Sequence, residues 1–153
     1  MKFFSWSGWN TATLLGLVSL FWLSCTAPAP GPRWKWMVMT TDLVRDSALI
    51  RIYDSMHSVN GVWPELTKAN KASGIEEIRI YRFDNRLVMM LRIPEGADLK
   101  KMDSLYVGAD PKVAIWGQLM NGFQRALPGM DSTRKWVEMS LIHHYEGGAY
   151  LEK

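Results

Sequence analysis

The chain of 153 residues lacks most of the features by which proteins are sorted into classes. It has one cysteine, Cys25, so its folded part must be held together by a hydrophobic core and not by disulfides. The formal net charge is only +3 and the charges are evenly spread, which argues against a nucleic-acid-binding surface. The sequence contains no HExxH motif and no glycine-rich phosphate loop, so neither a zinc protease nor a nucleotide site is indicated. The length favours one domain.

Residues 1–25 have the layout of a secretory signal peptide. Lys2 is followed by an apolar stretch, Ala12–Leu23, that is shorter than the roughly 20 residues of a membrane-spanning helix. Cys25 stands where a lipoprotein signal places its acylated residue, so we expect lipidation there and an exported, membrane-anchored lipoprotein on the periplasmic side of a bacterium. An ordinary cleaved signal or a simple anchor is the alternative. Residues 26–32 contain three prolines and predict a short, stiff tether.

Residues 33–146 are expected to form one domain, and residues 147–153 a loose tail. Strands are predicted over 33–41, 77–83, 86–93 and 135–142, and helices over 48–59, 64–72, 99–106 and 111–127. Asp46, Asp98 and Asp110 are expected at the starts of three helices, Pro64 at the start of the second helix and Gly74 at its end, and Asp84-Asn85 at the hairpin turn. The order strand, broken helix, strand, strand, helix, strand is that of the split βαβ unit. The predicted fold class is therefore α+β, ferredoxin-like, with helices on one face of an antiparallel sheet.

The other face of this sheet would lack a cover. In the strand over 77–83, alternation separates Ile78 and Ile80 from Arg79, Tyr81 and Phe83. We expect the face with Tyr81 both to pack against a second subunit, giving a homodimer, and to line a pocket.

Candidate chemistry begins with Tyr53 and His57, which are four residues apart on a predicted helix and share a face. A buried histidine with a satisfied hydrogen bond is the simplest interpretation of this pair alone. Trp63 and Tyr81 add aromatic surface, and sugars are bound by such a mixture of rings and polar groups. His143 and His144 lie near two glutamates, but their spacing does not favour a metal site, and none is predicted.

Three sequence blocks resemble the L-rhamnose mutarotase family in order and spacing. They are Tyr53-x-x-x-His57 with Val62-Trp63-Pro64-Glu65-Leu66; Gly74-Ile75 with Ile78-x-Ile80-Tyr81-Arg82 and Asn85-Arg86-Leu87-x-Met89; and Asp110-Pro111-Lys112-Val113-x-x-Trp116-x-x-Leu119-Met120 with Leu127-Pro128 and Lys135-Trp136-Val137. The resemblance implies a dimeric α/β-barrel of ferredoxin-like subunits. It also implies that His57 is the acid/base group and that Tyr53 and Trp116 lie near the sugar.

The predicted function is that of a sugar mutarotase, which interconverts the α and β anomers of L-rhamnose or a related 6-deoxy sugar without a cofactor. Trp63, Tyr81, Trp116 and Arg92 are the candidate sugar contacts. Some family members have a tyrosine where this chain has Ile78, and a second tryptophan where it has Gly117, so L-fucose is a further candidate substrate. A non-catalytic sugar-binding lipoprotein and a small dimeric-barrel oxygenase are the alternatives, because fold alone does not separate them.

Overall fold

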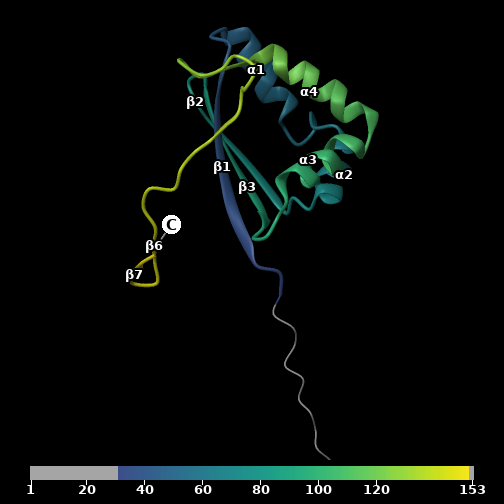
Figure 1. Cartoon of the computed structure of the whole chain (residues 1–153). Helices are drawn as coiled ribbons and strands as arrows, with labels where there is room; N and C mark the ends of the chain where they lie inside the picture. Colours follow the sequence, from purple (N-terminus) through teal and green to yellow (C-terminus); the bar gives the residue numbers. More distant parts are fainter. Residues whose placement is uncertain (1–30, 152–153) are drawn as a thin grey trace, which may run out of the picture. The chain divides into compact units, whose positions relative to one another are not determined.

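The computed structural model describes residues 31–151 (Figure 1). The predicted signal peptide, Cys25 and most of the tether lie outside these residues. The main sheet consists of β1 (Trp34–Leu43), β2 (Glu77–Phe83), β3 (Arg86–Pro94) and the two-residue strands β4 (Gln124–Arg125) and β5 (Val137–Glu138). Its strand order is β2-β3-β1-β4, β5 also pairs with β1, and every pairing is antiparallel.

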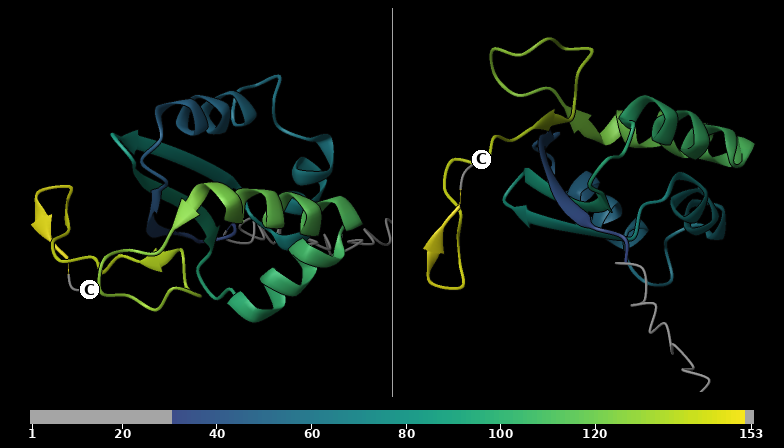
Figure 2. Two further views of the ribbon diagram at one scale, coloured as in Figure 1. Left: turned by 90° about the horizontal axis from the view of Figure 1, so that it is seen from above. Right: turned by 60° about the horizontal axis from the view of Figure 1, so that its bottom comes forward.

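Four helices lie on one side of this sheet (Figures 1 and 2). They are α1 (Ser47–Met56), α2 (Pro64–Ser73), α3 (Leu99–Gly108) and α4 (Pro111–Phe123). Three of them begin at the predicted aspartates, Asp46, Asp98 and Asp110, whose side chains accept hydrogen bonds from the first free backbone N–H groups. The helix α2 begins at Pro64 and is closed by Gly74 at φ 81°. Local sequence therefore sets most helix ends.

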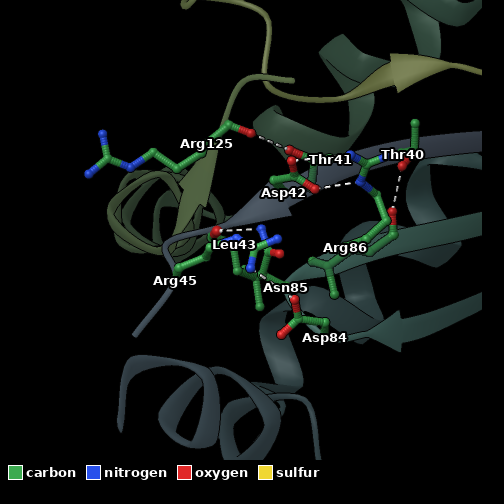
Figure 3. A network of polar contacts seen from close by, with 10 residues as sticks. Thr40, Thr41, Asp42, Leu43, Arg45, Asp84, Asn85, Arg86 and Arg125 are labelled. Carbon is green, nitrogen blue, oxygen red and sulfur yellow. Dashed lines mark hydrogen bonds and ion pairs between the residues drawn. The ribbon is translucent and has the colours of Figure 1, made fainter. Parts of the chain in front are cut away.

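The β2–β3 hairpin turns at Asp84 and Asn85, as predicted. Asp84 adopts φ 52°, which aspartate tolerates better than most residues. Asn85 is buried, and its side-chain amide donates a 3.2 Å hydrogen bond to the carbonyl of Leu43 (Figure 3). The turn thus ties the hairpin to the end of β1, the central strand.

Alternation divides the sheet into two faces. The face toward the helices carries Thr41, Leu43, Leu87, Leu91 and Ile93, which are all buried. The core continues into the helices through a set of buried side chains: Tyr53, Leu66, Ala69, Val113, Trp116 and Met120. The predicted arrangement of an antiparallel sheet with helices on one face is confirmed.

Several predicted boundaries were wrong. The helix α4 ends at Phe123 instead of residue 127, because Gln124 and Arg125 pair with the end of β1. The expected strand over 135–142 is reduced to Val137–Glu138, followed by one further backbone hydrogen bond to β1, which the Met139 N–H donates to the Val38 carbonyl at 2.8 Å. The tail region instead forms a separate hairpin, β6 (Tyr145–Glu146) with β7 (Ala149–Tyr150). Pairing with the distant strand β1 decided the first two of these ends, whereas the hairpin of β6 and β7 forms between neighbouring residues.

The helix α1 also stops earlier than predicted, at Met56, because the following loop folds back on it. A side chain at Gly61 would place its Cβ 2.1 Å from the carbonyl oxygen of Ser55, so only glycine fits this contact. The close approach of this loop leaves His57 at the helix end.

Candidate active site

A cavity of about 1000 Å³ lies between the helices and the sheet. Its floor is apolar and comes from three strands: Met37, Met39, Ile78, Ile80, Met89 and Leu91. Ile78 and Ile80 are each 37% exposed although they point toward the helices, so their exposure is to this cavity. The volume lies at the upper end of the roughly 300–1,000 Å³ typical of small-molecule sites.

His57 lies in the wall of this cavity, directly after the last turn of α1. Its Nδ1 is 2.9 Å from the backbone carbonyl oxygen of Tyr53. A carbonyl can only accept, so Nδ1 carries the hydrogen and Nε2 keeps a free lone pair. Burial lowers the pKa of His57 from its ordinary value of 6.5, although the Tyr53 carbonyl and the nearby Asp54 carboxylate act in the opposite direction. The imidazole is therefore neutral at neutral pH and available as a base.

The Tyr53 ring stacks on His57, with 4.1 Å between centroids and 28° between planes. Tyr53 is only 2% exposed, and burial raises the pKa of its phenol to about 12, while a hydrogen bond with the Gln124 side chain acts against that rise. The phenol therefore stays protonated and serves as a hydrogen-bond donor. Tyr53 holds the imidazole from one side.

Trp116 on α4 is the third ring of the cluster. Its ring meets His57 edge-on at 5.5 Å and Trp63 edge-on at 5.2 Å. Trp116 lines the cavity, whereas Trp63 is absent from the lining and packs behind Trp116. The structure therefore brings together Tyr53, His57 and Trp116. Trp63 packs against Trp116 and does not line the cavity.

Tyr81 and Arg92 do not line this cavity. Tyr81 pairs with Val88 and Arg92 with Glu77, and these pairs point to the side away from the helices. The expectation that the Tyr81 face of the sheet lines the pocket is therefore wrong, because the cavity uses the other alternation set. Arg92 makes ion pairs with Glu76 and Glu77 and covers the ring of Trp34 at 5.8 Å.

Several polar groups of the cavity escaped the sequence analysis. Asp54 and Arg82 line it as an ion pair, and the amide oxygen of Asn70 is buried with no hydrogen-bond partner among the described residues. Alternation could have placed Arg82 on the Ile78 and Ile80 face, two residues beyond Ile80. Asn70 lies four residues after the buried Leu66, so helical spacing could have indicated its inward position.

No group of three or more histidine, aspartate or glutamate side chains in residues 31–151 is arranged to hold a metal ion. The Nε2 atom of His144, considered above for such a cluster, lies 3.4 Å from a carboxylate oxygen of Glu146. The site consists of rings, one imidazole and a few polar side chains.

Known proteins that are similar to this chain are sugar mutarotases. Residues 37–145 match the family model described as L-rhamnose mutarotase. An L-fucose mutarotase from Xanthomonas campestris pv. campestris is 39% identical over 101 residues, which cover 66% of this chain and 80% of that protein. An L-rhamnose mutarotase structure from Formosa agariphila superposes with a TM-score of 0.51 at 17% identity, covering 73% of this chain and 99% of that one. The ferredoxin-like fold predicted from the sequence is confirmed by this superposition.

These matches overturn the predicted location. They place the chain among enzymes of sugar metabolism, and the prediction of an exported, membrane-anchored lipoprotein is wrong. That prediction rested on composition near Cys25, whereas a mutarotase acts on a free sugar and needs no bilayer for its chemistry. No helix in residues 31–151 is long and apolar enough to cross a membrane. Cys25 itself lies outside the described residues.

Proposed function

Because the chain belongs to the L-rhamnose mutarotase family, and is thus a carbohydrate isomerase, we propose that it interconverts the α and β anomers of a 6-deoxy-L-hexose with His57 as its acid/base group. One observation carries the assignment of His57. Its Nδ1–H is held by the Tyr53 carbonyl, so the cavity-lining imidazole has only Nε2 left with which to act on a ligand.

The reaction needs one proton to move and one bond to break. Nε2 of His57 takes the proton from the anomeric hydroxyl, the oxygen's electron pair forms the C1 carbonyl, and the bond from C1 to the ring oxygen breaks. The imidazolium then returns its proton to the ring oxygen. The open aldehyde rotates about the C1–C2 bond and closes on its other face through the reverse steps. A group with a pKa near neutrality suits both directions.

The neighbouring rings fix this chemistry in place. Tyr53 stacks on the imidazole and keeps its phenolic proton, so it orients His57 without competing as a base. Trp116 offers an apolar surface beside the imidazole for the C–H face of a sugar. The Gly117 position leaves open space, because a Cβ built there would meet nothing within 4 Å.

The substrate is assigned as L-fucose or L-rhamnose. The curated relative at 39% identity is an L-fucose mutarotase, and the family model is named for L-rhamnose. The floor of methionine and isoleucine side chains suits the methyl group that distinguishes 6-deoxy sugars from ordinary hexoses. Neither alternative, the binding lipoprotein or the oxygenase, has an observation in its favour.

Saturation-transfer NMR tests the proposal directly. Exchange between the two anomers of L-fucose and of L-rhamnose is measured with and without the protein, and with the His57→Ala variant. We expect faster exchange with the wild type and a loss on the order of a hundredfold or more in the variant, as for removal of a general acid/base group. Wild-type protein that binds either sugar without accelerating exchange would contradict the proposal.

We further propose that the face of the sheet away from the helices packs against the same face of a second copy. This face carries a set of apolar side chains, with Arg79, Arg86 and Arg92 among them: Trp36, Val38, Tyr81, Phe83, Val88 and Met90. Phe83 is 85% exposed and Tyr81 53%, an unusual exposure for large rings on a sheet. In such a dimer Tyr81 and Arg92 would lie in the interface, and their role as sugar contacts stays a prediction.

A further inference from the structure

The catalytic helix is joined to the edge strand of the sheet by one ion pair. Arg82 on β2 donates from Nε to Oδ1 of Asp54 on α1 at 3.0 Å and from a terminal nitrogen to Oδ2 at 2.7 Å. A further terminal nitrogen donates to the backbone carbonyl of Asp84 at 2.9 Å. Three of the five N–H groups of the guanidinium are thus directed at partners in the fold, and the two carboxylate oxygens of Asp54 share one bidentate contact.

This pair lies beside the acid/base group. Asp54 directly follows Tyr53 and precedes His57 by three residues, so it occupies the same helical turn as the stacked rings. Both Asp54 and Arg82 line the cavity. The ion pair therefore forms part of the wall next to the imidazole.

Stability alone does not account for the pair. The side chains are 35% and 45% exposed, and ion pairs with that exposure contribute little to folding. The contact bridges 28 positions of the chain, however, and connects the helix that carries His57 to the strand that carries Ile78 and Ile80. The ion pair is therefore better explained by the two elements that it connects than by its contribution to stability.

We propose that Arg82 is a positioning residue for the mutarotase reaction, which through its bidentate contact with Asp54 fixes the turn of α1 carrying His57 and balances the charge beside the imidazole. This inference rests on the proposed function. Nothing in the comparisons assigns a role to either residue.

The charges around His57 determine the sign of the expected effects. On its own helix it meets the Asp54 carboxylate and the neutral phenol of Tyr53, and Arg82, which is paired with Asp54, lines the same cavity from β2. Asp103 on α3, and Arg134 and Glu138 after α4, complete the charged lining of the cavity. The aromatic residue packed on it from α4, Trp116, carries no charge. The Asp54 charge acts to raise the pKa of His57. Removal of Arg82 leaves that charge unbalanced, whereas removal of Asp54 leaves Arg82 unbalanced.

The test titrates His57 by NMR of its imidazole in the full-length wild type, Arg82→Met and Asp54→Asn, and measures anomer exchange against pH in parallel. We expect Arg82→Met to move the titration midpoint up by about half a pH unit and Asp54→Asn to move it down by a similar amount. Because the neutral imidazole is the base, the anomer exchange rate on the acidic side of its pH profile should shift with this midpoint. At a pH below the midpoint, exchange in Arg82→Met should be on the order of threefold lower than in the wild type.

A conservative variant separates charge from geometry. Arg82→Lys keeps the positive charge but loses the two-pronged contact, so it should leave the titration midpoint in place and lower the maximal exchange rate. The matched control is Arg86→Met, because Arg86 lies on the same hairpin as Arg82 and forms a similar ion pair with Asp42 on β1, outside the cavity lining (Figure 3). This control should change neither quantity.

The inference is overturned if Arg82→Met and Asp54→Asn shift the midpoint in the same direction or not at all. It is also overturned if Arg82→Lys retains the full exchange rate. The imidazole titration needs no turnover, so it tests the role of Arg82 even in a protein without mutarotase activity. Absence of exchange in the wild type would refute the proposed function instead.

Discussion

The Nδ1–H of His57 donates a hydrogen bond to the backbone carbonyl of Tyr53 on its own helix. This bond leaves Nε2 as the nitrogen that can take a proton. A histidine at a helix end often forms such a bond, and by itself it would indicate only a satisfied buried residue. Two neighbours give it a chemical use, since Tyr53 stacks on one side and Trp116 meets its edge. At the residue scale, the site is thus a neutral imidazole held among rings.

The pH dependence of activity follows from this environment. Burial lowers the pKa of His57 below 6.5, so the neutral base persists to lower pH than a free histidine would allow. We expect exchange to rise with pH through this lowered pKa and to be level at pH 7. The measurement is the anomer exchange rate from pH 4.5 to 8, corrected for the spontaneous rate. A midpoint above that of free imidazole would contradict the assignment.

At the scale of elements, the end of α1 is set by the loop that follows it. The helix stops at Met56 and the chain folds back, so that Gly61 lies against the carbonyl of Ser55. This return places His57 at the helix end with its side chain in the cavity wall. The Asp54–Arg82 pair then anchors the same turn to the sheet.

Gly61→Ala should disturb this element and the site together. The added Cβ would lie 2.1 Å from the oxygen of Ser55, so the loop or the last turn of α1 must move. We expect a loss of about 1–3 kcal/mol in the free energy of unfolding, measured with urea, and lower exchange activity.

Gly122→Ala is the matched control for this substitution. Gly122 lies within α4, and a Cβ there would meet nothing within 4 Å. Alanine is the better helix former, so this variant should gain roughly 0.5–1 kcal/mol. Equal stability changes in the two variants would show that the contact at Gly61 does not constrain the loop.

At the scale of the whole molecule, the two faces of the sheet have separate uses. The helix-facing side supplies the cavity floor, and the outer side exposes Trp36, Tyr81 and Phe83. A monomer would leave these rings in water, and the proposed dimer would cover them.

Phe83→Asp should therefore weaken self-association. A charge buried in an apolar interface is costly, so we expect the variant to sediment as a monomer at concentrations where the wild type is a dimer. Val59→Asp is the control, because Val59 is 97% exposed but lies in the loop after α1. Sedimentation velocity over a range of concentrations checks both, and a wild type that is monomeric throughout would refute the proposed interface.

Much of this protein follows from its sequence. Aspartate caps, Pro64, Gly74 and the Asp84–Asn85 turn act over a few residues, so they predicted the helix starts, one helix end and the hairpin. The order of elements then predicted the fold, and the spacing of Tyr53 and His57 brought together two rings that share a helix face. Each of these features depends on only a few neighbouring residues, so the sequence is sufficient to predict it.

The tertiary structure decided what depends on distant partners. The cavity lies on the side of the sheet that carries Ile78 and Ile80, because the helices pack over this side and not over the side that carries Tyr81. The pairing of Asp54 with Arg82, the support of Trp116 by Trp63 and the end of α4 at Phe123 all join segments far apart in the chain. Residue type and spacing do not specify which such segments meet, since that depends on how the packed layers fit together.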